Sequence, residues 1–332
     1  MAETLYIPVE EQHQEGEARR AVASWSLERG YSVEERSKLA TVVSELGRNL
    51  ALHTREGGFL LLRQTQKGKP EVEIMALDRG PGMANFAACA RDGYSTAGTA
   101  GAGLGAVMRG SAFFDVHTQL ESGTALLSRL FTRDEDSKAG LRLGLVNVAK
   151  KGEHICGDTC AFAELGGGRA RLMIADGLGH GPLAAEASEL AAKVFREGSG
   201  MDLPFLLERM NAALRSTRGA AIAIAEVNPA QQQVRYAGVG NIAGAIVGPG
   251  KSTHLVSHNG TVGSTFPKPR EFTYGWTSDS SLIMNSDGLK SQWRLDGYVG
   301  LQQRHPALVA GVLFRDFNRG SDDSTVATLR LP

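Results

Sequence analysis

Acidic residues of the second half of the chain stand beside glycines or at the ends of short apolar runs. Asp158 follows a glycine, Asp176 and Asp287 each precede one, and Asp322 begins an Asp-Asp pair just before the last apolar run. Carboxylates so far apart in sequence can converge only if a hard divalent cation neutralises them. Two such ions would activate a water for in-line attack on a phosphate monoester and stabilise the leaving oxygen. The pattern therefore predicts a two-metal centre.

A different set of chemically capable residues lies in the first half. Glu45 and Asn49 are four residues apart on an expected helix, so both side chains project from one face and could hold a metal-bound phosphate or orient an attacking hydroxyl. Asp78 ends an apolar run and could accept a hydrogen bond from an exocyclic amine. Residues 92–105 are rich in glycine and hydroxyl groups and lead into a helix-compatible segment, which favours a phosphate cradle.

A dinucleotide fingerprint is the competing interpretation of the glycine-rich stretch. Gly101 and Gly103 with Ala106 fit its spacing, but that motif needs an apolar strand immediately before it. The preceding residues 95–100 are Ser-Thr-Ala-Gly-Thr-Ala, so we reject this interpretation.

The three motifs of the first half, in this order, resemble the GHKL ATPase superfamily. Residues 45–49 match its N box, 78–82 its first glycine box and 101–105 its second. The runs S-E-L-G-R-N-L, D-R-G-P-G-M and D-G-Y-S-T-A-G look most like the RsbT-type serine kinases and anti-sigma regulatory domains of bacterial partner-switching systems, over most of residues 5–131.

This resemblance implies an ATP/ADP site with Mg²⁺. Asn49 would help to bind Mg²⁺, Glu45 would be the catalytic general base toward a substrate hydroxyl, and Asp78 would bind adenine. Residues 93–105 would form a lid over ATP. The further nucleotide contacts implied are Gly80, Gly82, Ser95, Thr96, Gly101, Gly103 and Gly105. The substrate would be a Ser or Thr on a small STAS-domain protein.

Residues 141–332 resemble the SpoIIE/RsbX-type members of the metal-dependent PPM protein phosphatases. The matching segments are C-G-D (156–158), A-D-G-L-G-H-G (175–181), S-D-G-L (286–289) and D-D-S-T-V-A (322–327). The implied Mn²⁺ or Mg²⁺ ligands are Asp158, Asp176, Gly177, Asp287 and Asp322. No arginine is assigned to the phosphate of the substrate.

Local patterns predict the elements that must position these residues. A capping box at 32–35 followed by apolar residues at helical spacing predicts a helix over 33–53, and strands are expected at 59–64 and 71–77. In the second half two helices are expected, at 183–196 and 204–216. The expected strands there are 143–148, 171–175, 220–227, 234–239, 242–247, 282–285 and 325–331. Many strands with few helices between them indicate an α+β fold.

The length of 332 residues favours two domains, and the polar stretch 134–140 is the best linker. We expect domains at 1–133 and 141–332. The resemblances imply a two-layer GHKL (Bergerat) ATP-binding fold followed by a PPM-type αββα sandwich.

Charge and cysteine content exclude several classes of protein. Lys and Arg number 36 and Asp and Glu number 36, so the formal net charge is zero and nothing favours nucleic acid or a membrane as partner. Three cysteines and an N-terminus without a signal-peptide pattern favour the cytoplasm. A zinc site from Cys156, Cys160, His154 and His180 has poor ligand spacing and is not favoured.

The sequence therefore favours a bifunctional enzyme that phosphorylates and dephosphorylates an STAS-domain protein. Holding both activities in one chain would raise the effective concentration of each at a shared substrate. One alternative is a first domain that only binds, sequestering an STAS protein, a sigma factor or an output enzyme in a nucleotide-dependent way. Another is that only the phosphatase is active and the ATP site regulates it.

Overall fold

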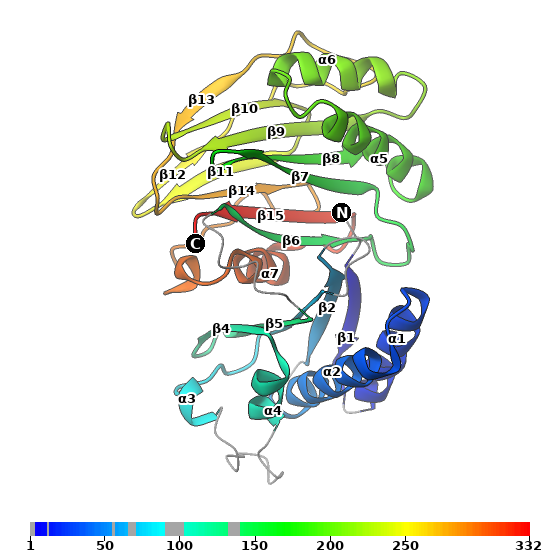
Figure 1. Ribbon diagram of the computed structural model, residues 1–332, viewed down its shortest axis with the longest axis vertical. Coiled ribbons are helices and arrows are strands. Elements are labelled where there is room, and N and C mark those ends of the chain that lie inside the picture. Colours follow the sequence, from blue (N-terminus) through cyan, green and yellow to red (C-terminus); the bar gives the residue numbers. More distant parts are fainter. Residues whose placement is uncertain (1–3, 12, 55–56, 66–70, 90–102, 132–139) are drawn as a thin grey trace. The chain divides into compact units, whose positions relative to one another are not determined.

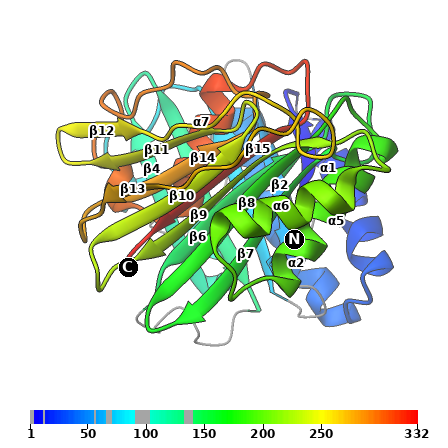
Figure 2. The same ribbon diagram turned by 90° about the horizontal axis from the view of Figure 1, so that it is seen from above.

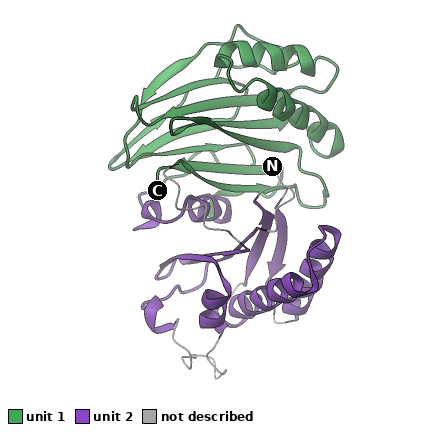
Figure 3. Ribbon diagram, in the orientation of Figure 1, with its two compact units in different colours: residues 1, 137–294, 316–332 green, residues 2–136, 295–315 purple. Residues whose placement is uncertain are grey.

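The computed structural model describes residues 4–11, 13–54, 57–65, 71–89, 103–131 and 140–332, and these form two compact units. One unit comprises residues 2–136 and 295–315, and the other residues 137–294 and 316–332, with residue 1 (Figure 3). We call them the N-unit and the C-unit.

The N-unit is built on an antiparallel sheet of five strands in the order β1-β2-β3-β5-β4 (Figure 1). The strands are β1 (Leu5–Val9), β2 (Gly58–Gln64), β3 (Val72–Asp78), β4 (Phe113–Gln119) and β5 (Gly123–Leu130). Its helices are α1 (Gln14–Glu28), α2 (Val33–His53), the short α3 (Phe86–Cys89) and α4 (Gly103–Gly110).

Helix α2 has the bounds that the sequence predicts. The Ser32 hydroxyl accepts from the Glu35 N–H, and the Glu35 carboxylate accepts from the Ser32 N–H, so the capping box is formed. Apolar side chains of α1, α2 and α4 pack on one face of the sheet to make the core of this unit. Leu39, Leu46 and Leu50 are among them.

The other face of the sheet carries a buried ion cluster. Side chains alternate along a strand, so Arg63 of β2, Glu73 of β3 and Arg129 of β5 point away from the helices. Arg63 Nε lies 2.8 Å from Glu73 Oε1, and Arg129 Nη2 lies 2.8 Å from Glu73 Oε2. Burial alone would raise the pKa of Glu73, but the two guanidinium groups outweigh it and lower this pKa to about 2.

Residues 295–315 cover part of this second face, although they come from the far end of the sequence. A Cβ placed on Gly311 of α7 (Pro306–Phe317) would lie 3.1 Å from the Met75 sulfur, and the Phe59 and Phe314 rings are 5.8 Å apart. Asp115 accepts from the His305 N–H at 2.7 Å. The expected extent of the second domain, 141–332, therefore differs from that of the C-unit, because residues 295–315 belong to the N-unit.

The C-unit is a sandwich of two five-stranded antiparallel sheets. One sheet has the order β13-β10-β9-β8-β7, from β7 (Asp158–Gly166), β8 (Arg169–Gly177), β9 (Ala220–Asn228), β10 (Gln233–Val239) and β13 (Phe272–Gly275). The other has the order β12-β11-β14-β15-β6, from β6 (Arg142–Val148), β11 (Ala243–Gly248), β12 (Lys251–His254), β14 (Ser281–Asn285) and β15 (Ser324–Arg330).

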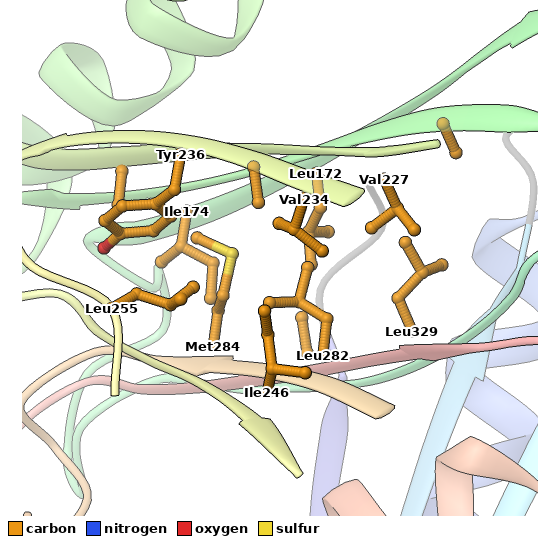
Figure 4. Close-up of a cluster of buried hydrophobic side chains, with 14 of the residues drawn as sticks. Leu172, Ile174, Val227, Val234, Tyr236, Ile246, Leu255, Leu282, Met284 and Leu329 are labelled. Carbon is orange, nitrogen blue, oxygen red and sulfur yellow. The ribbon is translucent and has the colours of Figure 1, made fainter. Parts of the chain in front are cut away.

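Apolar side chains from both sheets fill the space between them (Figure 4). Leu172, Val234 and Tyr236 extend from one sheet, and Leu282 and Met284 from the other. Helices α5 (Pro182–Glu197) and α6 (Leu203–Leu214) lie across the outer face of the first sheet (Figure 2). The helix α7, which would add a fourth layer to an αββα sandwich, belongs to the N-unit as far as residue 315.

All strands and both helices expected in the second half are present, with ends shifted by up to two residues. In this half the sequence analysis missed three strands, β7, β12 and β13, and the helix α7. The expected linker lies outside the described residues, except for Gly140.

Candidate active sites

The four acidic motifs of the second half meet at one end of the sandwich. Asp158 opens β7 and faces Asp176 near the end of β8, and these two residues are paired in register. Asp287 follows β14 and Asp322 precedes β15, in the other sheet. The carboxylates of Asp158, Asp287 and Asp322 all act electrostatically on Asp176. The structure therefore brings these four side chains into one neighbourhood.

We call the side chains of Asp158, Asp176, Asp287 and Asp322 the carboxylate cluster. Asp158 is the most deeply buried of the four. The Ser286 hydroxyl donates to Asp158 Oδ2 at 2.6 Å, and the Thr325 N–H donates to the Ser286 oxygen at 2.9 Å. The Asn147 amide donates to the Asp158 carbonyl oxygen at 3.2 Å. Burial raises the pKa of Asp158 to about 7, although the bond from Ser286 opposes the shift.

Asp176 and Asp287 occupy the less enclosed part of the cluster. Burial raises the pKa of Asp176 to about 9, and the surrounding carboxylates add to the effect. Burial and the neighbouring Asp322 also raise the pKa of Asp287, whose Oδ2 accepts from the Asn241 amide at 2.8 Å. Several carboxyl groups held in this way repel one another when ionised, and a divalent cation would remove the repulsion.

The two members of the Asp322-Asp323 pair have different surroundings. Asp323 accepts from the Lys150 N–H at 2.8 Å and from the Gly157 N–H at 3.0 Å, so each of its two carboxylate oxygens accepts a hydrogen bond from a backbone N–H. Asp322 accepts through Oδ1 from the Asp323 N–H at 2.9 Å and acts on the carboxylates of Asp176 and Asp287. Asp323 is thus a positioning residue that the sequence analysis missed; the Asp-Asp doublet was its only signal.

Two glycines of these motifs are required by close backbone contacts. A Cβ on Gly177 would lie 2.0 Å from the Ala184 carbonyl oxygen, and one on Gly288 would lie 2.0 Å from the Asp323 carbonyl oxygen. Any larger residue would push the neighbouring chain, and the carboxylates with it, out of place.

The donor set suits a hard cation such as Mg²⁺ or Mn²⁺, which takes carboxylate, carbonyl and water oxygens. Across the described residues no three His, Cys, Asp or Glu side chains converge closely enough to hold one ion by themselves. The carboxylates therefore border the site, and the Gly177 carbonyl and water would have to complete the coordination.

Stability should depend on pH and on metal. The native pKa values of Asp158 and Asp176 lie above the ordinary value of about 4, so the metal-free folded chain holds protons that the unfolded chain releases, and its stability falls from pH 4 to pH 9. At pH 8, Mg²⁺ or Mn²⁺ at a hundred times its Kd should add about 2.7 kcal/mol, and the same concentration should add less at pH 5, where protons compete for the carboxylates. We expect the metal-induced rise in Tm, measured by scanning calorimetry, to be larger at pH 8 than at pH 5. Equal shifts at both pH values would contradict the cluster as the binding site.

The first-half motifs also come together, within the N-unit. A Cβ placed on Gly103, the first residue of α4, would lie 2.7 Å from Glu45 Oε2 and 3.7 Å from Asn49 Oδ1. The α2 face that carries Glu45 and Asn49 therefore lies against Gly103, at the start of α4. Gly105 is buried in α4. Ser95, Thr96 and Gly101 lie outside the described residues.

Asp78 is held in a fixed orientation at the end of β3. Its Oδ1 accepts from the Gly80 N–H at 2.7 Å and from the Thr124 N–H at 3.2 Å, and burial raises its pKa. Gly82 has a φ of +70°, and a Cβ there would lie 2.3 Å from the Gln119 carbonyl oxygen, so the fold itself requires this glycine.

Arg315 is a residue near this site that the sequence analysis did not find. Its Nη1 donates to the Asp78 carbonyl oxygen at 2.6 Å, and the Arg79 guanidinium donates to the Arg315 carbonyl oxygen. No sequence pattern connects residue 315 with residue 78. The contact exists because α7 lies on the sheet of the N-unit.

Comparison with known proteins finds one family model and two curated relatives that match parts of the chain. Residues 166–332 match the family model for stage II sporulation protein E (SpoIIE). The phosphoserine phosphatase RsbX of Bacillus subtilis strain 168 is 31% identical over 141 residues, which are 42% of this chain and 70% of RsbX. The serine/threonine-protein kinase RsbT of the same organism is 31% identical over 109 residues, which are 33% of this chain and 82% of RsbT.

Solved structures agree with the fold of the second half. A chain from a study of the bacterial stressosome, described as a modular system adapted to control secondary messenger signalling, has a TM-score of 0.53 and 26% identity, over 57% of this chain and 99% of that one. RsbX in complex with magnesium has a TM-score of 0.51 and 23% identity, over 60% of this chain and 98% of that one.

The sandwich and its carboxylate cluster define a PPM-type serine/threonine phosphatase. The chain belongs to the SpoIIE family within this class, and its N-terminal part is homologous to RsbT. Within the described residues, no helix combines the length and the apolar character that a membrane crossing requires.

Proposed function

We propose that this protein sets the phosphorylation state of an STAS-domain protein by two opposed activities. The N-unit would be a GHKL-type ATP-dependent serine kinase, and the C-unit would remove the same phosphoryl group. The observation that carries this proposal is the similarity of one chain to both a serine/threonine kinase and a phosphoserine phosphatase of one organism, each at 31% identity.

The kinase step would use the meeting point of α2 and α4. Asp78 would accept a hydrogen bond from the adenine amine, with its carboxylate held by Gly80 and Thr124. Asn49 would bind the Mg²⁺ that neutralises the phosphates, while Glu45 accepts the proton of the substrate hydroxyl as its oxygen attacks the γ-phosphorus and ADP leaves. Gly103 allows the phosphates to approach both side chains, since any Cβ there would contact Glu45.

The phosphatase step would use the carboxylate cluster. Bound Mg²⁺ or Mn²⁺ would supply a nucleophilic water and polarise the phosphate. Asp158, Asp176, Asp287 and Asp322, with the Gly177 carbonyl, would hold two ions, and Ser286 and Asn241 would orient Asp158 and Asp287 through the bonds described above. Asp323 would keep the 150–157 loop closed on the site.

A time course of label transfer from γ-labelled ATP to an STAS-domain protein tests the whole proposal. The parent chain and the Asp287→Asn variant are compared in Mg²⁺ and Mn²⁺. We expect label to accumulate with the variant and to fade with the parent, because the variant keeps the kinase and loses the phosphatase. Label that fades equally with both proteins would contradict the role of Asp287, and no label with either would contradict the kinase.

A nucleotide-dependent binding module is the second candidate for the N-unit, and one contact favours it. Arg48 Nη1 lies 3.6 Å from Glu45 Oε1, and Arg48 Nη2 lies 3.6 Å from Glu15 Oε1, so the proposed base is engaged by a guanidinium. Under this alternative Glu45→Gln would leave partner binding and ATP binding intact and change no phosphorylation. Under the kinase proposal the same variant binds ATP and the partner but transfers no label. Phosphatase turnover that responds to ATP or ADP without any labelled protein would instead indicate a regulatory nucleotide site.

A further inference from the structure

Large apolar side chains are exposed around the carboxylate cluster. Ile155, Leu178 and Leu183 are 43%, 43% and 52% exposed. They are three of the five large hydrophobic residues exposed in the described part of the C-unit, and the other two are Phe205 and Val256. Single exposed apolar residues are ordinary, but three in one neighbourhood indicate an interaction surface. We call Ile155, Leu178 and Leu183 the apolar rim.

Backbone contacts place the apolar rim beside the cluster. The Gly177 N–H donates to the Gly157 carbonyl oxygen at 3.2 Å, and Cβ atoms on either glycine would lie within 2.8 Å of Ala184. Gly157, Gly177 and Ala184 are therefore in mutual contact. Each rim residue is one or two positions from one of these three, and Gly157 and Gly177 directly adjoin Asp158 and Asp176.

A cation lies at the edge of the same surface. The Leu178 N–H donates to the Gly219 carbonyl oxygen at 3.0 Å, which brings the 218–219 turn against the 178–179 loop. A Cβ on Gly179 would lie 2.9 Å from Arg218 Nη1. Arg218 is exposed, and its guanidinium suits a phosphate or a carboxylate on an incoming molecule.

We propose that the apolar rim, with Arg218 at its edge, is the docking surface for the folded phosphoprotein that the C-unit dephosphorylates. This rests on the proposed phosphatase activity. A folded protein is the occupant that fits, because a small phosphate ester could reach the carboxylates without covering the apolar rim. The positive charge of Arg218 would complement the dianionic phosphate of such a protein.

The test compares a small and a protein substrate for each variant. The small substrate is p-nitrophenyl phosphate. The protein substrate is an STAS-domain protein phosphorylated with RsbT of Bacillus subtilis. For Ile155→Ser/Leu183→Ser we expect kcat/KM for the protein to fall at least ten times more than for the small ester. Leu178 is left unchanged because it adjoins a proposed metal ligand. Phe205→Ser is the matched control, since Phe205 is 53% exposed on α6 and should alter neither value.

Arg218→Gln tests the charge. The kcat/KM of the parent for the phosphoprotein should fall as NaCl is raised, and this salt dependence should be smaller for the variant, because screening acts on the attraction that Arg218 supplies.

Other results would overturn the proposal. An equal fall for both substrates, or no fall for either, would mean that the apolar rim does not dock the substrate. A change only in the oligomeric state of the double variant, measured by light scattering, would mean that a second copy of the chain covers the rim. Failure of the parent to hydrolyse p-nitrophenyl phosphate would instead contradict the proposed phosphatase itself.

Discussion

Replacing Asp176 by Asn should lower metal-dependent hydrolysis of p-nitrophenyl phosphate by at least about 100-fold, the upper end of the loss found for residues that merely support metal ligands. Asp176 lies among the carboxylates of Asp158, Asp287 and Asp322, and its raised pKa records the cost of placing its charge there. Without metal, the variant should have a higher Tm than the parent at pH 8, because the folded parent must hold a proton on Asp176 that the unfolded chain releases, whereas Asn is neutral in both states. Loss of activity together with a gain in metal-free stability distinguishes a ligand site from simple unfolding.

Asp279→Asn is the control for this prediction. Asp279 is exposed in the same unit, between β13 and β14, so its replacement removes the same charge from the surface. Activity and Tm should both stay close to those of the parent. Full activity in Asp176→Asn, or equal effects of the two substitutions, would show that Asp176 does not serve the metal centre.

Removing the carboxylate of Glu73 should destabilise the N-unit by about 3–5 kcal/mol, which is the usual cost of removing one partner of a buried ion pair. Glu73→Ala would leave the buried guanidinium groups of Arg63 and Arg129 without the carboxylate that bridges them. Because the native pKa of Glu73 is lowered to about 2, its contribution is present above pH 4.5 and is lost as the pH falls toward 2. Urea unfolding with hydrogen exchange on β2, β3 and β5 measures the effect.

Two further variants make this prediction specific. Glu34→Ala, at an exposed position in the first turn of α2, should cost less than about 1 kcal/mol. The triple variant Arg63→Met/Glu73→Leu/Arg129→Met should recover much of the lost stability, because a well-packed apolar cluster often equals a buried ion cluster. A triple variant as unstable as Glu73→Ala would contradict this explanation.

Sequence reasoning succeeded where the signal is local. The helix at 33–53 was predicted with its observed ends because its capping box and apolar stripe both lie within the segment. The convergence of Asp158, Asp176 and Asp287 could be predicted because each adjoins a glycine. Negative charges that are brought close together imply a cation that they share.

Sequence reasoning failed where long-range packing decides the structure. Residues 306–315 of α7 are all buried, so they lack the amphipathic spacing by which a helix is found. The roles of Arg315 and Asp323 depend on contacts with residues 78, 150 and 157, far away in the chain. Ligand assignments at both sites stay predictions.

The placement of residues 295–315 on the N-unit bears on how this chain can be divided. A fragment ending at the polar stretch 134–140 would keep every strand of the first sheet but would lose the layer that covers Met75 and Phe59, and with it the Arg315 contact to Asp78. Cutting that stretch would not release two independent pieces, because the C-terminal piece still carries a structural part of the N-unit. Dividing the sequence at this stretch would therefore separate the N-unit from a segment of its own structure.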